Sequence, residues 1–384
     1  MIYYNGKRRL SDFLKKCGEG NDLAIAFIGG SITQGAAASD DGLCYAAGVY
    51  KWFRQKYPLS GFKYINAGIG ATTSQFGAAR VCEDVLKYSP DLVFIEYGVN
   101  DNDEAPFERR ELFREAYEGL LRKVLSSGSK PAVILIHNVR YDDGSSEEDM
   151  HSGLGEYYDL PSVSVGRIIY DRIKTGSLNA ADITPDNLHP NDRGHKLAAQ
   201  IITEAIETLE NGISYMNTAP LKRTETGEIP DGDILPPPLT ANDYEEINRF
   251  NNLNLSPQTD GFTADTTGQE KREGMPLVRD VFKNGWYAYL SGASITFTVY
   301  GGELCVMYKK TIKRPAPAAK AIIDDDEENA VILDANFNET WGDKAYMATL
   351  LHHGEDKEHK LEIILTETAD NPFYLINVIA KKVK

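Results

Sequence analysis

Leu23-Ala24-Ile25-Ala26-Phe27-Ile28-Gly29-Gly30-Ser31 is the stretch that decides the fold of this chain. Its apolar residues end in two glycines, a pattern typical of a buried strand that leads into a tight turn. In open α/β sheets, ligands bind just beyond the carboxyl ends of the strands. The sequence therefore predicts that Ser31 lies where such a sheet carries out its chemistry, with a helix cap as the alternative role for this serine.

Segments with strand and helix patterns alternate through the first half of the chain. The expected strands are short apolar runs, at residues 23–28, 62–65, 92–95, 132–136 and 163–165. The expected helices carry apolar residues at helical spacing, at residues 45–57, 76–87, 108–126, 167–174 and 193–210. A polar loop is expected from residue 137 through His151. This alternation predicts an α/β domain whose parallel sheet is covered on both faces.

A proline-rich segment separates this half from a second half with a different periodicity. Residues 216–240 are expected to form a linker, because proline disfavours helix and central strand alike. Beyond it, apolar and polar residues alternate, for example at 294–300, which predicts the strands of a β-sandwich or jelly roll. The predicted domains are residues 1–215, the linker, and residues 241–384.

Composition excludes several classes of partner. A length of 384 residues favours two domains, and a net charge of −16 argues against nucleic acid or anionic membranes as partners. No apolar span reaches the about 20 residues of a membrane helix. The start of the chain lacks the apolar core of a signal peptide, so we expect cytoplasmic residence. The four cysteines show no CxxC spacing and predict neither a zinc site nor a redox pair.

Side chains suited to acyl transfer follow the predicted strands. Ser31 needs a base, and an Asp186 three residues before His189 can orient that imidazole from the same side of one helical turn. The expected oxyanion donors are the Ser31 N–H, an N–H of the glycine turn at 68–71, and the Asn100 side chain. Each signal alone is weak, since Asp186 can cap a helix and Asn100 can shape a turn. Their joint occurrence predicts a serine hydrolase.

At four stretches the sequence resembles the SGNH, or GDSL-like, hydrolase family. The matching blocks are Gly29-Gly30-Ser31, Asn66-Ala67-Gly68-Ile69-Gly70, Gly98-Val99-Asn100-Asp101 and Asp186-Asn187-Leu188-His189-Pro190. The resemblance covers residues 20–212. It implies a three-layer, flavodoxin-like domain with a mostly parallel sheet, a Ser31–His189–Asp186 triad, and neither metal nor cofactor.

The sequence departs from the family pattern at two places. Gly30 stands where the GDSL name has aspartate, which removes a side chain but no backbone N–H. The glycine block reads Gly-Ile-Gly-Ala instead of Gly-x-Ser-Gly, so the oxyanion N–H belongs to Gly70 or Ala71, and Gly70 is preferred. His195 lies six residues past His189 and is expected to serve packing or to lie on a helix surface.

The pairing of the two domains favours a carbohydrate ester as substrate. An SGNH domain joined to a β-sandwich is similar to carbohydrate O-acetylesterases, and no amphipathic stretch suits an oil interface. The expected function is removal of O-acetyl groups from hemicellulose oligosaccharides, derived from mannan or xylan. The alternatives are a lysophospholipase or thioesterase for longer acyl chains, a glycan-binding protein without activity, and an acetyltransferase. The substrate-binding residues and the oligomeric state, a homo-oligomer included, stay open.

Overall fold

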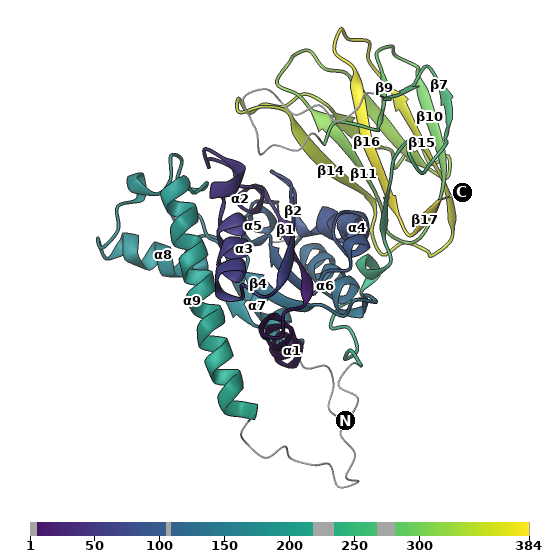
Figure 1. The fold of residues 1–384 in the computed structure, drawn as a ribbon. Helices are drawn as coiled ribbons and strands as arrows, with labels where there is room; N and C mark the ends of the chain where they lie inside the picture. Colours follow the sequence, from purple (N-terminus) through teal and green to yellow (C-terminus); the bar gives the residue numbers. More distant parts are fainter. Residues whose placement is uncertain (1–5, 105–108, 218–233, 267–280, 384) are drawn as a thin grey trace. The chain divides into compact units, whose positions relative to one another are not determined.

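A computed structural model describes residues 6–104, 109–217, 234–266 and 281–383 of the chain (Figure 1). The described chain divides into two compact units, with the main boundary between Asn242 and Asp243. Each unit has a hydrophobic core of its own. Most of the predicted linker, residues 218–233, lies outside the described residues.

A parallel sheet of five strands forms the centre of the first unit. In spatial order, these strands are β2 (Gly61–Gly68), β1 (Asp22–Gly29), β3 (Leu92–Glu96), β4 (Ala132–Ile136) and β5 (Ser162–Val163). This is the flavodoxin-like order, so the predicted fold class is confirmed. Gly29 at the end of β1 pairs with Gly68 of β2 and with Glu96 of β3, which brings the three carboxyl ends side by side.

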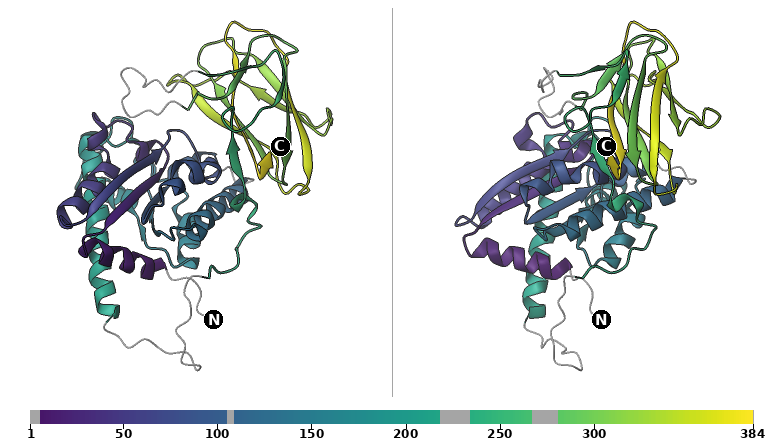
Figure 2. Two further views of the ribbon diagram at one scale, coloured as in Figure 1. Left: turned by 45° about the vertical axis from the view of Figure 1, so that its right-hand side comes forward. Right: turned by 90° about the vertical axis from the view of Figure 1, so that its right-hand side faces the viewer.

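Helices cover both faces of this sheet (Figures 1 and 2). They are α1 (Gly6–Gly18), α2 (Ser31–Gln34), α3 (Tyr45–Lys56), α4 (Ser74–Asp84), α5 (Gly98–Glu104), α6 (Arg110–Ser126), α7 (Glu148–Tyr157), α8 (Val165–Lys174) and α9 (Asp192–Asn217), with short 3-10 turns at Asp41–Leu43, Leu86–Tyr88 and Ala180–Asp182. Because strand side chains alternate between faces, Ile25 and Phe27 share one core with α1, α3 and α9. Leu135 points to the other face, where it lies against Gly155 of α7. None of the helices in the described ranges is long and apolar enough to cross a membrane.

Several elements differ from the sequence-based expectation. The expected polar loop through His151 contains α7, and Val165 begins α8 instead of ending a strand. Helix α9 runs seven residues past the expected end at Glu210. Helix α1 was not expected, although its buried residues Leu10, Phe13, Leu14 and Cys17 recur at helical spacing.

The second unit is a β-sandwich, as predicted (Figure 2). One antiparallel sheet contains β7 (Gln258–Asp260), β10 (Ser294–Tyr300), β12 (Ala318–Ile323), β13 (Val331–Asp334), β15 (Glu358–Leu365) and β17 (Lys382–Val383). The other contains β6 (Asn248–Phe250), β8 (Thr263–Ala264), β9 (Trp286–Ala288), β11 (Leu304–Lys310), β14 (Lys344–Leu351) and β16 (Phe373–Ala380), and a 3-10 turn covers Asp243–Glu245. Ile295, Phe297 and Val299 of β10 are buried and pack with β11 and β16 of the facing sheet.

The end of the proline-rich segment is bonded to the first unit. Glu118 of α6 is fully buried, and its carboxylate accepts hydrogen bonds from the backbone N–H groups of Leu239 (2.7 Å) and Thr240 (2.8 Å). Arg122, one helical turn later, donates to the carbonyl oxygen of Pro236 at 2.8 Å. These bonds hold the chain on α6 just before the second unit begins.

Candidate active site

Ser31 lies at the carboxyl end of the sheet, directly after β1. It begins α2, a helix of four residues that ends at a Gly35 with φ of 102°. A left-handed residue favours glycine, so Gly35 ends the helix without steric strain. The Ser31 side chain does not cap this helix: its Oγ lies 2.8 Å from Nε2 of His189. The cap interpretation of Ser31 is therefore wrong.

Asp186 and His189 meet through a turn rather than through a helix. The Asp186 carboxylate accepts hydrogen bonds from the backbone N–H groups of Leu188 (3.0 Å) and His189 (2.7 Å). Asn187 between them has φ of 61°, and α9 begins only at Asp192. The same-side placement expected from helical spacing thus comes from an aspartate turn, in which the side chain bonds the backbone two and three residues on.

The Asp186 turn also orients the imidazole. Nδ1 of His189 lies 2.7 Å from Oδ2 of Asp186. Burial alone would raise the pKa of Asp186, but the hydrogen bonds from the side chain and backbone of His189 outweigh it and lower that pKa. An ionised Asp186 keeps the proton on Nδ1, so Nε2 accepts the hydrogen bond from the Ser31 hydroxyl. The structure thus brings together the three residues predicted as a triad.

Asn100 lies beside the nucleophile loop. It belongs to α5, which follows β3, and a Cβ at Gly30 would overlap its Oδ1. The missing side chain at position 30 is therefore what permits this close approach. Among the described residues, no hydrogen bond engages the Asn100 Nδ2 or the Ser31 N–H. Both groups can therefore donate to a ligand.

The glycine turn after β2 supplies a further donor. The N–H of Gly70, the donor preferred from the sequence, donates to Oε1 of Gln34 and is engaged within the protein. Ala71 has a φ of 54°, and within the described ranges no acceptor bonds its N–H. Here the structure differs from the sequence-based preference, because the Gly70 N–H is already bonded to the Gln34 side chain. No spacing rule singles out Gln34 from the sequence.

A buried carboxylate lies behind the nucleophile loop. Glu96 ends β3 with 2% of its surface exposed, and its Oε2 lies 3.2 Å from the Thr33 hydroxyl. Burial raises the pKa of Glu96 to about 7, against the lowering effect of hydrogen bonds from Asn138, Thr33 and the Gly30 backbone. Sequence analysis did not single out this residue, although an acid at the end of an otherwise apolar strand is a usable signal.

His195 is a packing residue in the interior and does not lie on a helix surface. It is fully buried, and its Nδ1 accepts from the Tyr45 N–H at 3.3 Å, while its Nε2 lies 3.2 Å from the Ala36 carbonyl oxygen. Burial lowers the pKa of His195 to about 4, so the ring is neutral near pH 7 and donates from Nε2. His195 thereby links α9, which follows His189, to the loop after Ser31.

A second Asp–His pair lies inside the first unit. His151 and Asp101 are both fully buried, with Nε2 and Oδ2 3.0 Å apart. The other Asp101 oxygen accepts from the N–H of Ser74, the first residue of α4. Asp101 therefore connects the helix that carries Asn100 to the helix after the glycine turn, which is a structural role.

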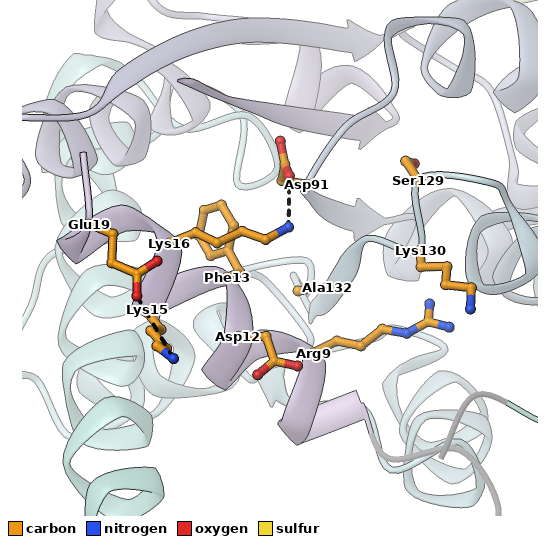
Figure 3. Close-up of a pocket in the computed structure, with 10 residues that line it drawn as sticks. All are labelled: Arg9, Asp12, Phe13, Lys15, Lys16, Glu19, Asp91, Ser129, Lys130 and Ala132. Atoms are coloured by element: carbon orange, nitrogen blue, oxygen red, sulfur yellow. Dashed lines mark ion pairs between the residues drawn. The ribbon is translucent and has the colours of Figure 1, made fainter. Parts of the chain in front are cut away.

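Two further groups of charged side chains have partners within the protein. In the second unit, ligand-type atoms of Asp243, Glu303 and His353 lie within 4.8 Å of one another, and Glu303 accepts from His352 Nδ1 at 2.8 Å. In the first unit, a hollow of about 490 Å³ lies beside α1 (Figure 3). It is lined by Arg9, Asp12, Phe13, Lys15, Lys16, Glu19, Asp91, Ser129, Lys130 and Ala132. It opens near the amino ends of β3 and β4, the opposite edge of the sheet from Ser31.

Comparisons with known proteins identify the family to which the first unit is similar. Residues 27–197 match the GDSL-like Lipase/Acylhydrolase family. An acetylxylan esterase of Geobacillus stearothermophilus is 28% identical over 215 residues, which cover 50% of this chain and 96% of that protein.

Two solved structures resemble the whole chain. Both are of a two-domain esterase active on acetylated mannans. The one co-crystallised with mannopentaose is 44% identical, covers 99% of this chain and 96% of its own, and has a TM-score of 0.86. The other is 45% identical over 98% and 96% of the two chains, with a TM-score of 0.85. The chain therefore belongs to the GDSL-like lipase/acylhydrolase family and is a carboxylic ester hydrolase.

Proposed function

We propose that this protein removes O-acetyl groups from mannan- or xylan-derived oligosaccharides, with Ser31 as its nucleophile. The observation that carries the proposal is the 44% identity, across both units, to a two-domain esterase active on acetylated mannans. The family match over residues 27–197 would by itself allow lipids as well as carbohydrates. The acetylxylan esterase relative supports the same type of ester but matches only half of the chain.

In the proposed reaction, His189 acts first as base and then as acid. Its Nε2 takes the proton of Ser31 Oγ, 2.8 Å away, as this oxygen attacks the acetyl carbonyl carbon. The ionised Asp186 stabilises the imidazolium that forms. The imidazolium then protonates the departing sugar oxygen, which leaves an acetyl group on Ser31. The same imidazole then deprotonates a water molecule, which attacks the acetyl carbon. As the bond to Ser31 Oγ breaks and acetate leaves, the imidazolium returns the proton to Oγ.

The oxyanion of each tetrahedral intermediate needs preorganised donors. We assign this role to the Ser31 N–H, the Ala71 N–H and the Asn100 Nδ2. All three lack a protein acceptor within the described part of the chain, whereas the Gly70 N–H is already bonded to Gln34. Donors without internal partners do not have to break a hydrogen bond when the oxyanion forms.

We propose that the second unit helps the enzyme to use oligosaccharide substrates. A β-sandwich can bind sugar rings on exposed aromatic side chains, and Trp341 (57% exposed) and Tyr289 (42% exposed) are of this kind. Removal of the second unit distinguishes glycan binding, which would affect only oligosaccharide substrates, from support of the active site, which would affect small esters as well. We propose no nucleic-acid partner, because the net charge is −16.

Acetate release from a panel of substrates tests the substrate class. The panel contains acetylated manno-, xylo- and pectin-derived oligosaccharides, together with aryl esters from acetyl to octanoyl. We expect the highest kcat/KM on an acetylated manno- or xylo-oligosaccharide and a steady decline as the aryl ester lengthens. A kcat/KM that rises toward octanoyl would reject the proposal in favour of a lysophospholipase or thioesterase.

A further inference from the structure

The Gln34 side chain connects the nucleophile helix to the glycine turn. Gln34 is the last residue of α2, has 6% of its surface exposed, and accepts the N–H of Gly70 at its Oε1. The backbones are also in close contact here, because a Cβ at Gly68 would clash with the Gln34 backbone. The Gln34–Gly70 hydrogen bond therefore lies in a packed region where water cannot easily replace the amide.

Both backbone polar groups of Ile69, at the start of the turn, also have protein partners. The N–H of Ile69 donates to the Gly29 carbonyl oxygen at 3.0 Å, and the Thr72 hydroxyl closes the turn by donating to the Ile69 carbonyl oxygen at 2.7 Å. Between these two points lie Gly70, bonded to Gln34, and Ala71, whose N–H has no acceptor among the described residues. The bond to Gln34 thus leaves Gly70 without a donor to offer, whereas the adjacent Ala71 N–H has no acceptor among the described residues.

The turn needs such a contact because its backbone is adaptable. Glycine has no Cβ and readily adopts several conformations, so Gly70 could rotate its peptide groups if its N–H were free. The ideal Cβ position of Gly70 lies 3.5 Å from Cβ of Ser31, so a rotation here would displace donors next to the reacting atoms. The left-handed Ala71, at φ of 54°, carries a conformation that alanine adopts only where its surroundings enforce it.

We propose that Gln34 is a positioning residue of the active site, which holds the glycine turn so that Ala71, and not Gly70, presents its N–H to the oxyanion. This inference rests on the proposed function, since it concerns the oxyanion site of that reaction. Gln34 touches no reacting atom itself. Its effect is to fix the place of a donor, which matters most in the tetrahedral transition state.

Gln34→Met tests the inference, because methionine has a similar length and no hydrogen-bond acceptor of comparable strength. Gln200→Met, at an exposed position of α9, is the matched control. For Gln34→Met we expect kcat on a small acetyl ester to fall about 10-fold to 100-fold with little change in KM. The affinity for a boronic acid that forms a tetrahedral adduct should fall by the same factor. Gln200→Met should match the native enzyme in both measurements.

A native-like kcat in Gln34→Met would overturn the inference. So would a lower kcat per folded protein with unchanged boronic-acid affinity, because a merely structural role would not single out the tetrahedral state. If Gln34→Met does not fold, Gln34→Asn, whose amide is one methylene too short to reach Gly70, takes the same test. Failure of the proposed function is recognised separately, by full activity in Ser31→Ala.

Discussion

At the scale of single residues, the proposed site combines a histidine in contact with the serine it would deprotonate and N–H donors without acceptors among the described residues. Ser31 Oγ lies 2.8 Å from His189 Nε2, so no side-chain movement is needed before proton transfer. Three N–H donors lack internal acceptors within the described ranges, on Ser31, Ala71 and Asn100. Ser31, Ala71 and Asn100 are all partly exposed, so water can bond these donors until an oxyanion takes its place.

Asn100→Ala tests the side-chain donor. The substitution removes Nδ2 but keeps the buried Val99 side chain and the Asp101 bonds that anchor α5. We expect kcat on a small acetyl ester to fall by about 10²–10³, because one donor to the oxyanion is lost. Steady-state kinetics measure this fall, with Asn102→Ala in the same helix as control. An Asn100→Ala enzyme within a factor of about three of the native kcat would contradict the assignment.

Glu96→Gln tests the buried carboxylate through the pH dependence of stability. Burial raises the pKa of Glu96 from 4.5 to about 7. Because the folded pKa exceeds the unfolded one, its contribution is fully present below about pH 4.5 and is lost as pH rises through 7. The native free energy of unfolding should therefore fall, relative to that of Glu96→Gln, by about 3 kcal/mol between pH 4.5 and pH 8.

Urea denaturation at several pH values measures this difference. Glu19→Gln, which replaces a carboxylate with 54% of its side chain exposed, should keep the native pH dependence. Parallel curves for native protein and Glu96→Gln would show that Glu96 does not carry the raised pKa.

The sequence pointed to the side chains proposed to react better than to the contacts that position them. Ser31, Asn100, Asp186 and His189 are recognisable because catalysis requires those residue types after particular strands or at a three-residue spacing. Gln34 could not be found in this way, because its role depends on a turn 36 positions further along the chain. For the same reason, the sequence could not show that the Gly70 N–H is bonded to Gln34.

At the scale of elements, the buried strands were predictable, whereas helix α7 was not. The run Ala132–Ile136 was expected as a strand with the bounds that the structure has, since five apolar residues fit a strand buried on both faces. Helix α7 contains Gly153, Gly155 and several polar residues, which weaken its helix propensity. Tertiary contacts stabilise it instead: Gly155 packs on Leu135, and His151 pairs with Asp101.

Glu118→Ala tests the attachment of the proline-rich segment to α6. The substitution removes the acceptor of the Leu239 and Thr240 N–H groups and of the Thr240 and Tyr158 hydroxyls. Because these bonds go to a buried carboxylate, we expect the free energy of unfolding to fall by about 3 kcal/mol. Chemical denaturation measures the fall. Glu111→Ala, at a side chain 59% exposed on the same helix, should change stability by less than about 0.5 kcal/mol.

A Glu118→Ala protein as stable as the native one would mean that water replaces Glu118 as acceptor for Leu239 and Thr240 without loss of unfolding free energy. The segment would then be a linker in the sense expected from its prolines.

At the scale of the whole molecule, the residues proposed to react and the second unit occupy different parts of the sequence. Every residue assigned to the reaction lies before Asn242, and the second unit has its own core between two sheets. The change from helical to alternating periodicity made this division predictable. The sequence could not show that residues 236–240 bond to α6, because proline content reports local stiffness and not tertiary contacts.

A protein that ends at Asn242 tests this separation. It keeps the Glu118 bonds and the whole parallel sheet, so we expect it to fold and to hydrolyse a small acetyl ester at a kcat close to that of the full chain. Its kcat/KM on an acetylated manno-oligosaccharide should fall at least about tenfold if the sandwich binds glycan. Circular dichroism confirms folding before kinetics. An equal loss on both substrates would show instead that the sandwich supports or completes the active site.

The measurement that tests the central claim most directly follows acetate release and the protein mass together, on an acetylated manno-oligosaccharide. The native enzyme should release acetate, and rapid quenching should show one added acetyl group that peptide mapping places on Ser31. Ser31→Ala, which keeps His189 and the oxyanion donors, should gain no acetyl group and lose at least about 10³-fold in rate. Native rates in Ser31→Ala, or an acetyl group on another residue, would contradict the account.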